Sequence, residues 1–144
     1  FFSPAVYALV LAGVAWTWQL VAVIVAFALW GIASHAFGAV QDVLADRAAG
    51  ISSIATARGA RWTVRFALAC YFAAGLVILA TAWPGPLAVI AVLPYIAIVW
   101  PYRSVTDETA EKATIGWRRF LWINQIAGFI VTVLLISYGL LAAA

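Results

Sequence analysis

Three long stretches of this chain contain no charged side chain, and they determine what it can fold into. Residues 1–41, 66–102 and 120–144 hold no Asp, Glu, Lys or Arg. A membrane helix needs roughly 20 consecutive apolar residues to cross the hydrocarbon core. About a quarter of a typical soluble domain is charged, against 9% of these 144 residues. The pattern predicts an all-α, multi-pass transmembrane helical bundle. It excludes a soluble enzyme, a nucleic-acid-binding domain and a disordered tail.

Two breaks within these stretches divide the chain into about five predicted spans. Residues 16–19 (Trp-Thr-Trp-Gln) suit a membrane interface, and residues 83–86 (Trp-Pro-Gly-Pro) cannot continue a helix. We expect helices over residues 4–16, 19–42, 66–82, 87–100 and 120–141, with a kink at Pro94. The chain has no Met and begins in apolar sequence, which indicates an internal or C-terminal portion of a longer protein.

All eight basic and five acidic residues lie in two windows, 42–65 and 103–119. Two predicted spans separate the windows, so both windows lie on one side of the membrane. Basic residues outnumber acidic ones in each window, and short loops rich in Arg and Lys stay in the cytoplasm. We therefore predict a cell-membrane protein with its charged loops in the cytoplasm and its C-terminus outside. The single cysteine, Cys70, excludes a disulfide framework and is interpreted as a small buried hydrophobe.

The most informative residues lie where the second predicted span meets the cytoplasm. On one continuous helix, Asp42 and Asp46 would lie about 40° apart, with His35 between them in angle and two turns deeper. Gly31 and Gly38 flank that face and would leave room beside it. Like charges at this spacing repel, and ionisable groups near a membrane are costly. A divalent cation would offset that cost, and Mg²⁺ favours one or two carboxylates together with waters and substrate phosphates.

Simpler interpretations of these residues remain open. The two carboxylates could mark a solvated helix end that pairs with Arg47, and His35 could be a hydrogen-bonded packing residue. Arg58, Arg61 and Arg65 fall on one predicted helical face and could contact diphosphate, while lipid headgroups are the simpler partners of the last two.

A second acidic cluster consists of Asp107, Glu108 and Glu111. It could be another metal site, but the basic residues at positions 103, 112 and 118 favour a solvated loop helix that they neutralise. Further along, Asn124 and its neighbour Gln125 are expected to hydrogen-bond between helices.

One motif in this region resembles the second aspartate-rich motif of the UbiA superfamily of membrane prenyltransferases. Its residues are Asp42-x-x-x-Asp46-Arg47-x-x-Gly50-Ile51-x-Ser53-x-Ala55-x-x-x-Gly59. The resemblance implies a bundle of nine transmembrane helices, of which these residues would form helices five to nine. Residues 1–144 would then be a partial prenyltransferase domain that lacks the N-terminal half and the first aspartate-rich motif. We expect this segment to be inactive alone.

The sequence around this motif is most similar to the carotenoid-modifying branch, the lycopene elongases. That resemblance implies Mg²⁺-dependent transfer of a prenyl group, here dimethylallyl, from an allylic diphosphate to a hydrophobic isoprenoid acceptor, here lycopene. Asp42 and Asp46 would hold Mg²⁺. Because His35 is expected on the same face, it could accept the proton lost after coupling or stabilise a cation electrostatically. Diphosphate contacts are expected from three nearby side chains, Arg47, Arg58 and Ser53.

Other functions compete with this one. The acceptor could instead be a quinone precursor, a tetrapyrrole alcohol or an ether lipid. A non-catalytic subunit that works with a second membrane polypeptide is also compatible with the sequence. A transporter is disfavoured, because its carboxylates are expected near the middle of the membrane on broken helices.

Overall fold

The computed structural model describes the backbone of residues 2–83 and 85–143, and their side chains except those of 130–132 and 134–143. Every regular element in this part of the chain is a helix, which confirms the all-α prediction. The elements are α1 (Ser3–Leu11), α2 (Trp18–Val40), α3 (Val43–Ala48), α4 (Ile54–Arg58), α5 (Ala60–Leu79), η1 (Gly85–Ala91), α6 (Leu93–Val99), η2 (Trp100–Tyr102), η3 (Asp107–Lys112) and α7 (Ala113–Ala143).

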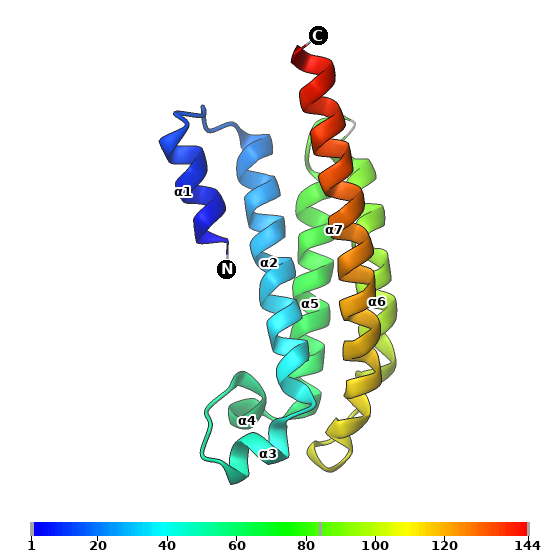
Figure 1. The fold of residues 1–144 in the computed structure, drawn as a ribbon. Coiled ribbons are helices and arrows are strands. Elements are labelled where there is room, and N and C mark those ends of the chain that lie inside the picture. Colours follow the sequence, from blue (N-terminus) through cyan, green and yellow to red (C-terminus); the bar gives the residue numbers. More distant parts are fainter. Residues whose placement is uncertain (1, 84, 144) are drawn as a thin grey trace.

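The long helices α2, α5 and α7 form a bundle with the consecutive helices η1 and α6, and α1 lies beside the first part of α2 (Figure 1). Within the described residues, three segments are long and apolar enough to cross a membrane. They are Trp18–Val40, Ala60–Leu79 and Gly85–Tyr102. The contact between α2 and α5 is lined by alanines such as Ala33 and Ala67, both fully buried. Small residues let two helix backbones approach closely within a membrane, where packing replaces the hydrophobic effect.

The first predicted helix is shorter than expected. It ends at Leu11 rather than at residue 16, because Gly13 adopts a φ of +64° and reverses the chain. The Val14 amide donates to the Leu9 carbonyl, and the Gly13 amide donates to Val10, the hydrogen-bond pattern of a glycine-terminated helix.

The other predicted spans correspond to helices with shifted ends. Thr17 begins α2 by accepting a hydrogen bond from the Leu20 amide at 3.2 Å. The predicted helix 66–82 is observed as α5, which begins six residues earlier. Near Pro94 the chain changes from the 3-10 helix η1 to α6, which agrees with a predicted interruption at that proline. The predicted helix 120–141 lies within α7.

Both charged windows lie at the same end of the bundle, as the span count predicted (Figure 1). There α3, α4 and η3 connect the long helices. At the opposite end, the Trp18 indole donates to the Ala80 carbonyl at 3.4 Å and joins the start of α2 to the end of α5. The described part of the molecule therefore has one charged end and one uncharged aromatic end.

Close packing of α2 against α7 corrects one expectation about Gly38. This glycine leaves no open room, because the Trp117 ring of α7 occupies the space and would lie 3.0 Å from an added Cβ. Gly116 of α7 is packed equally closely, against the rings of Tyr102 and Phe37. An added Cβ there would lie 2.5 Å from the Tyr102 ring and 3.0 Å from the Phe37 ring. The two glycines allow aromatic side chains to fill the crossing.

Candidate functional site

The two aspartates of the motif lie on a turn and a short helix, not on one long helix. Helix α2 ends at Val40, and Asp42 begins α3 with a φ of −100° and a ψ of 3°. Asp46 lies in the first turn of α3, where its amide donates to the Asp42 carbonyl at 2.8 Å. The expectation that one continuous helix carries His35 and both aspartates is therefore wrong. Asp favours helix starts over helix interiors, and the fully buried Val43 fixes α3 against the bundle.

The carboxylates of Asp42 and Asp46 have no ion-pair or hydrogen-bond partner within the described part of the chain. The Asp42 side chain is exposed and makes no capping hydrogen bond to α3, and Asp46 is half-buried. Among the described residues, neither carboxylate takes part in an ion pair or a hydrogen bond. Two unpaired carboxylates one helical turn apart fit the protein share of a Mg²⁺ site, whose other ligands are waters and substrate phosphates.

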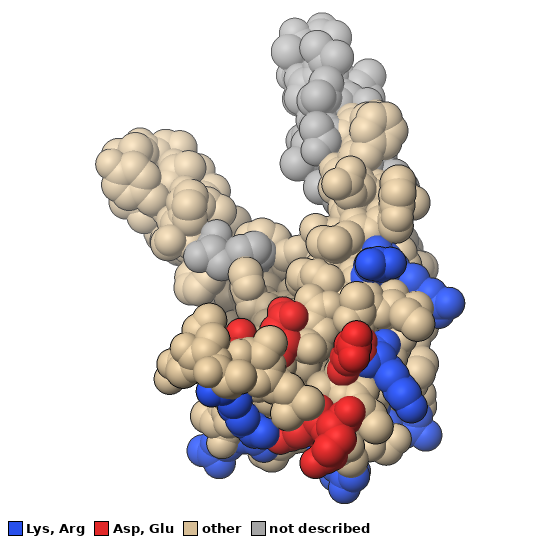
Figure 2. Space-filling model, turned by 60° about the horizontal axis from the view of Figure 1, so that its bottom comes forward, with Lys and Arg blue, Asp and Glu red and all other residues tan. Residues whose placement is uncertain are grey.

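Asp42 also faces the second acidic cluster, which the sequence alone did not predict. It lines a pocket of about 370 Å³ together with Asp107, Glu108 and Glu111. Figure 2 shows the acidic side chains gathered on this end of the molecule, with basic side chains around them. No set of three or more His, Cys, Asp or Glu side chains in the described residues has the geometry of a metal site.

Arg47 is bound to two other parts of the charged end. Its Nη1 donates to Asp107 Oδ2 at 2.6 Å, in an ion pair between residues 60 positions apart. Its Nε and Nη2 donate to the Thr56 carbonyl at 3.2 Å and 3.1 Å. Asp107 is thus paired with Arg47, and not with the basic residues at 103, 112 and 118 that we expected. The Ala60 amide and the Arg47 guanidinium lower the pKa of the Asp107 carboxyl below its ordinary value.

The remaining predicted diphosphate ligands have structural partners of their own. Ser53 caps α4 by accepting from the Thr56 amide at 3.2 Å. Arg58 ends α4, with its guanidinium carbon 5.4 Å from the centre of the Trp62 ring. Gly59, with a φ of +81°, separates α4 from α5, so Arg58 does not share one helical face with Arg61 and Arg65. The diphosphate contacts expected from Ser53 and Arg58 stay predictions.

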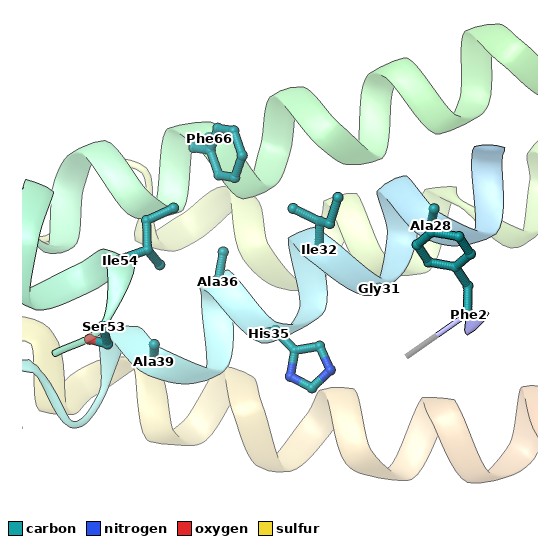
Figure 3. A pocket seen from close by; sticks show the side chains of 10 residues that line it. All are labelled: Phe2, Ala28, Gly31, Ile32, His35, Ala36, Ala39, Ser53, Ile54 and Phe66. Atoms are coloured by element: carbon teal, nitrogen blue, oxygen red, sulfur yellow. The ribbon is translucent and has the colours of Figure 1, made fainter. Parts of the chain in front are cut away.

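His35 lies in a separate, mostly apolar pocket. The pocket has a volume of about 430 Å³ and is formed mainly by α2, with further walls from the start of α4 and from α5. Figure 3 shows Ser53 at one end of this pocket and Phe2 and Ala28 at the other, with His35 on α2 between the two ends. His35 is exposed on the surface of α2. The pocket can accept an apolar chain. Its two polar side chains are that of Ser53, at one end, and that of His35, along the wall formed by α2.

Polar contacts inside the bundle hold the helices beside these pockets. The Ser34 and Tyr71 hydroxyls join α2 to α5 at 3.0 Å. The Tyr95 hydroxyl donates to Asn124 Oδ1 at 3.4 Å, which confirms the predicted interhelical hydrogen bond for Asn124. Cys70 is buried, as expected.

Comparison with known proteins gives strong similarity along nearly the whole chain. No protein-family model and no solved structure matches it. The C(50) beta-cyclic carotenoids biosynthesis protein LbtBC of Dietzia sp. is 53% identical over 133 residues, which are 92% of this chain and 31% of that protein. A lycopene elongase/hydratase of Corynebacterium glutamicum is 37% identical over 137 residues, which are 95% of this chain and 48% of that protein. The chain is therefore similar to proteins named for carotenoid biosynthesis, and it spans less than half the length of each of these two.

Proposed function

We propose that this chain forms part of a membrane prenyltransferase of the UbiA type that adds a dimethylallyl group to lycopene. The observation that carries the proposal is the 37% identity to a protein named lycopene elongase/hydratase, which extends over 95% of this chain. The all-α bundle with three apolar helices of membrane-spanning length supports it. So do the two free carboxylates at the charged end and, separately, the apolar pocket that His35 lines.

Asp42 and Asp46 are the residues that would hold Mg²⁺ at the charged end of the bundle. Both carboxylates are free of ion pairs among the described residues, which is what a cation site requires. When bound, the ion would draw charge from the diphosphate as the C–O bond of the allylic donor breaks. We assign no acid–base role to either aspartate, because an ionised carboxylate that binds a metal does not donate a proton.

The apolar pocket beside His35 would receive an isoprenoid chain. Its walls carry apolar side chains such as Ala28, Ile32 and Phe66. In the full-length protein, walls of this kind would keep bulk water from a reactive carbon centre. The new C–C bond takes its electron pair from the terminal double bond of the acceptor, and diphosphate leaves with the pair of the broken C–O bond. The product then loses a proton or adds water. His35 is among the residues that line this pocket, and it is the side chain that we assign to accept the proton.

The test uses the full-length native gene in a host that accumulates lycopene. Wild type is compared with Asp42→Asn and Asp46→Asn, which remove the charge at nearly constant shape. Lys112→Gln is the matched control, because it removes an exposed charge from the same end without lining either pocket. Pigments are extracted and examined by chromatography and mass spectrometry.

The expected result is a carotenoid with one or two five-carbon additions in wild type and in the control, and unchanged lycopene in both aspartate variants. If wild type leaves lycopene untouched, the assignment of the acceptor is wrong. Mg²⁺-dependent binding of labelled dimethylallyl diphosphate to the same membranes then decides whether a quinone, tetrapyrrole or ether-lipid acceptor should be tested. If wild type shows no such binding either, a non-catalytic role replaces the enzyme proposal.

A further inference from the structure

Asp107 connects the two charged segments of the chain through both of its carboxylate oxygens. Oδ2 accepts from Arg47 at 2.6 Å, and Oδ1 accepts from the Ala60 amide at 2.6 Å. Ala60 is the first residue of α5, and Arg47 lies in α3 next to Asp46. One side chain of η3 therefore fixes the short acidic helix relative to a long helix of the bundle.

The surroundings of Asp107 are shaped for this contact. Gly59 adopts a φ of +81°, which favours glycine, and a Cβ added there would lie 3.3 Å from Asp107 Oδ1. The side chain of Asp107 is 24% exposed, so water screens the ion pair only in part. On the other side, Arg47 donates twice to the Thr56 carbonyl and so ties α4 to the same group. Three short elements and the start of α5 thus depend on one carboxylate.

We propose that Asp107 is a positioning residue that sets the place of the Asp42–Asp46 turn through Arg47. The inference rests on the proposed function, in which those two aspartates bind Mg²⁺. Both oxygens of Asp107 already have protein partners, so its role is to orient the metal-binding turn and not to bind the ion. Loss of a direct hydrogen-bond partner of a metal ligand typically weakens metal affinity or activity by about 10-fold to 100-fold. Asp107 reaches the turn only through Arg47, so this range is the upper bound for its effect.

The test measures prenyl transfer by the full-length protein in membranes as a function of Mg²⁺ concentration. Asp107→Asn keeps an oxygen for the Ala60 amide and loses the charge that pairs with Arg47. We expect it to raise the Mg²⁺ concentration for half-maximal activity, at most by about 10-fold to 100-fold, and to regain most of the rate at saturating Mg²⁺. Arg47→Ala should behave in the same way. The double variant Arg47→Ala with Asp107→Asn should be no less active than the less active of the two single variants, and Lys112→Gln should match wild type.

Three outcomes would overturn the assignment. A fall in activity that follows the amount of folded protein, at an unchanged Mg²⁺ requirement, would make Asp107 merely structural. A complete loss that no Mg²⁺ concentration restores, as expected for Asp42→Asn, would make it a ligand. Additive losses in the double variant would show that Asp107 does not act through Arg47.

Binding of Mn²⁺ separates this inference from the proposed function. Electron paramagnetic resonance measures Mn²⁺ binding by the purified full-length protein without any need for turnover. If wild type makes no carotenoid product but binds Mn²⁺, the reaction proposed above is wrong, and the positioning role is judged by whether Asp107→Asn weakens that binding. If wild type binds no Mn²⁺ and makes no product, both proposals fail.

Discussion

The hydroxyl oxygens of Ser34 and Tyr71 lie 3.0 Å apart between α2 and α5, where both side chains are buried. Ser34 donates its only hydroxyl hydrogen to the Trp30 carbonyl at 2.7 Å, so Tyr71 must be the donor between the two hydroxyls. The hydrogen bond therefore has a defined direction, and removing its donor should reduce folding stability by a different amount from removing its acceptor.

We therefore expect Ser34→Ala to destabilise the protein more than Tyr71→Phe. The first variant leaves a buried tyrosine hydroxyl without its acceptor, which costs about 1–3 kcal/mol, while the second loses a net hydrogen bond worth about 0.5–1.5 kcal/mol. Thermal unfolding of the full-length protein in detergent measures both. The double variant should be no less stable than Ser34→Ala alone, and a larger loss in Tyr71→Phe would contradict the assigned direction.

The tight crossing of α2 and α7 predicts a strong effect at Gly116. Gly116→Ala places a methyl group 2.5 Å from the Tyr102 ring, so the rings of Tyr102 and Phe37 must shift. Overpacking of this kind costs about 1–3 kcal/mol. Gly128→Ala is the matched control on the same helix, because nothing lies within 4 Å of an added Cβ there. The melting temperature should fall in the first variant and stay level or rise in the second. Equal melting temperatures of the two variants would contradict the close contact between Gly116 and the Tyr102 ring.

The lowered pKa of Asp107 predicts a contribution to stability at acid pH. The Ala60 amide and then Arg47 favour the ionised form in the folded protein, so the folded pKa lies below the ordinary value of 3.8. The stabilisation is therefore complete above that ordinary value and is lost as pH falls through the lower folded pKa. Melting temperatures measured at a series of pH values should converge for wild type and Asp107→Asn at the acid end. Glu111→Gln serves as the control from the same short helix, and a constant gap between wild type and Asp107→Asn at all pH values would contradict the prediction.

The apolar pocket predicts a separation between folding and product formation. Ala28→Phe places a large ring in a cavity of about 430 Å³ and should reduce carotenoid product while the protein still reaches the membrane. Val23→Phe lies on the same helix, at an exposed position that does not line the pocket, and should retain wild-type product. Product yield relative to protein level, measured by pigment extraction and immunoblotting, compares the two. Full activity in Ala28→Phe would remove this pocket from the substrate path.

Much of the site could be named from the sequence, although its geometry could not. The acidic pair stood out because charge is rare in this chain and costly near a membrane. The end of α2 at Val40 could not be predicted in this way, because the apolar run continues without a break up to Asp42. The separate helix α3 is recognised only in the structure, where Val43 is buried against the bundle. The turn between α2 and α3 places His35 in one pocket and Asp42 in another.

The helical class, the approximate limits of the long helices and the gathering of charge at one end all followed from the amino-acid sequence. These follow from the exclusion of charged side chains from hydrocarbon, which acts on each segment independently. The pairing of Arg47 with Asp107 and the packing of Trp117 beside Gly38 became visible only in the packed helices. Those contacts join residues 60 or more positions apart, and no local periodicity encodes which distant side chains meet when helices pack.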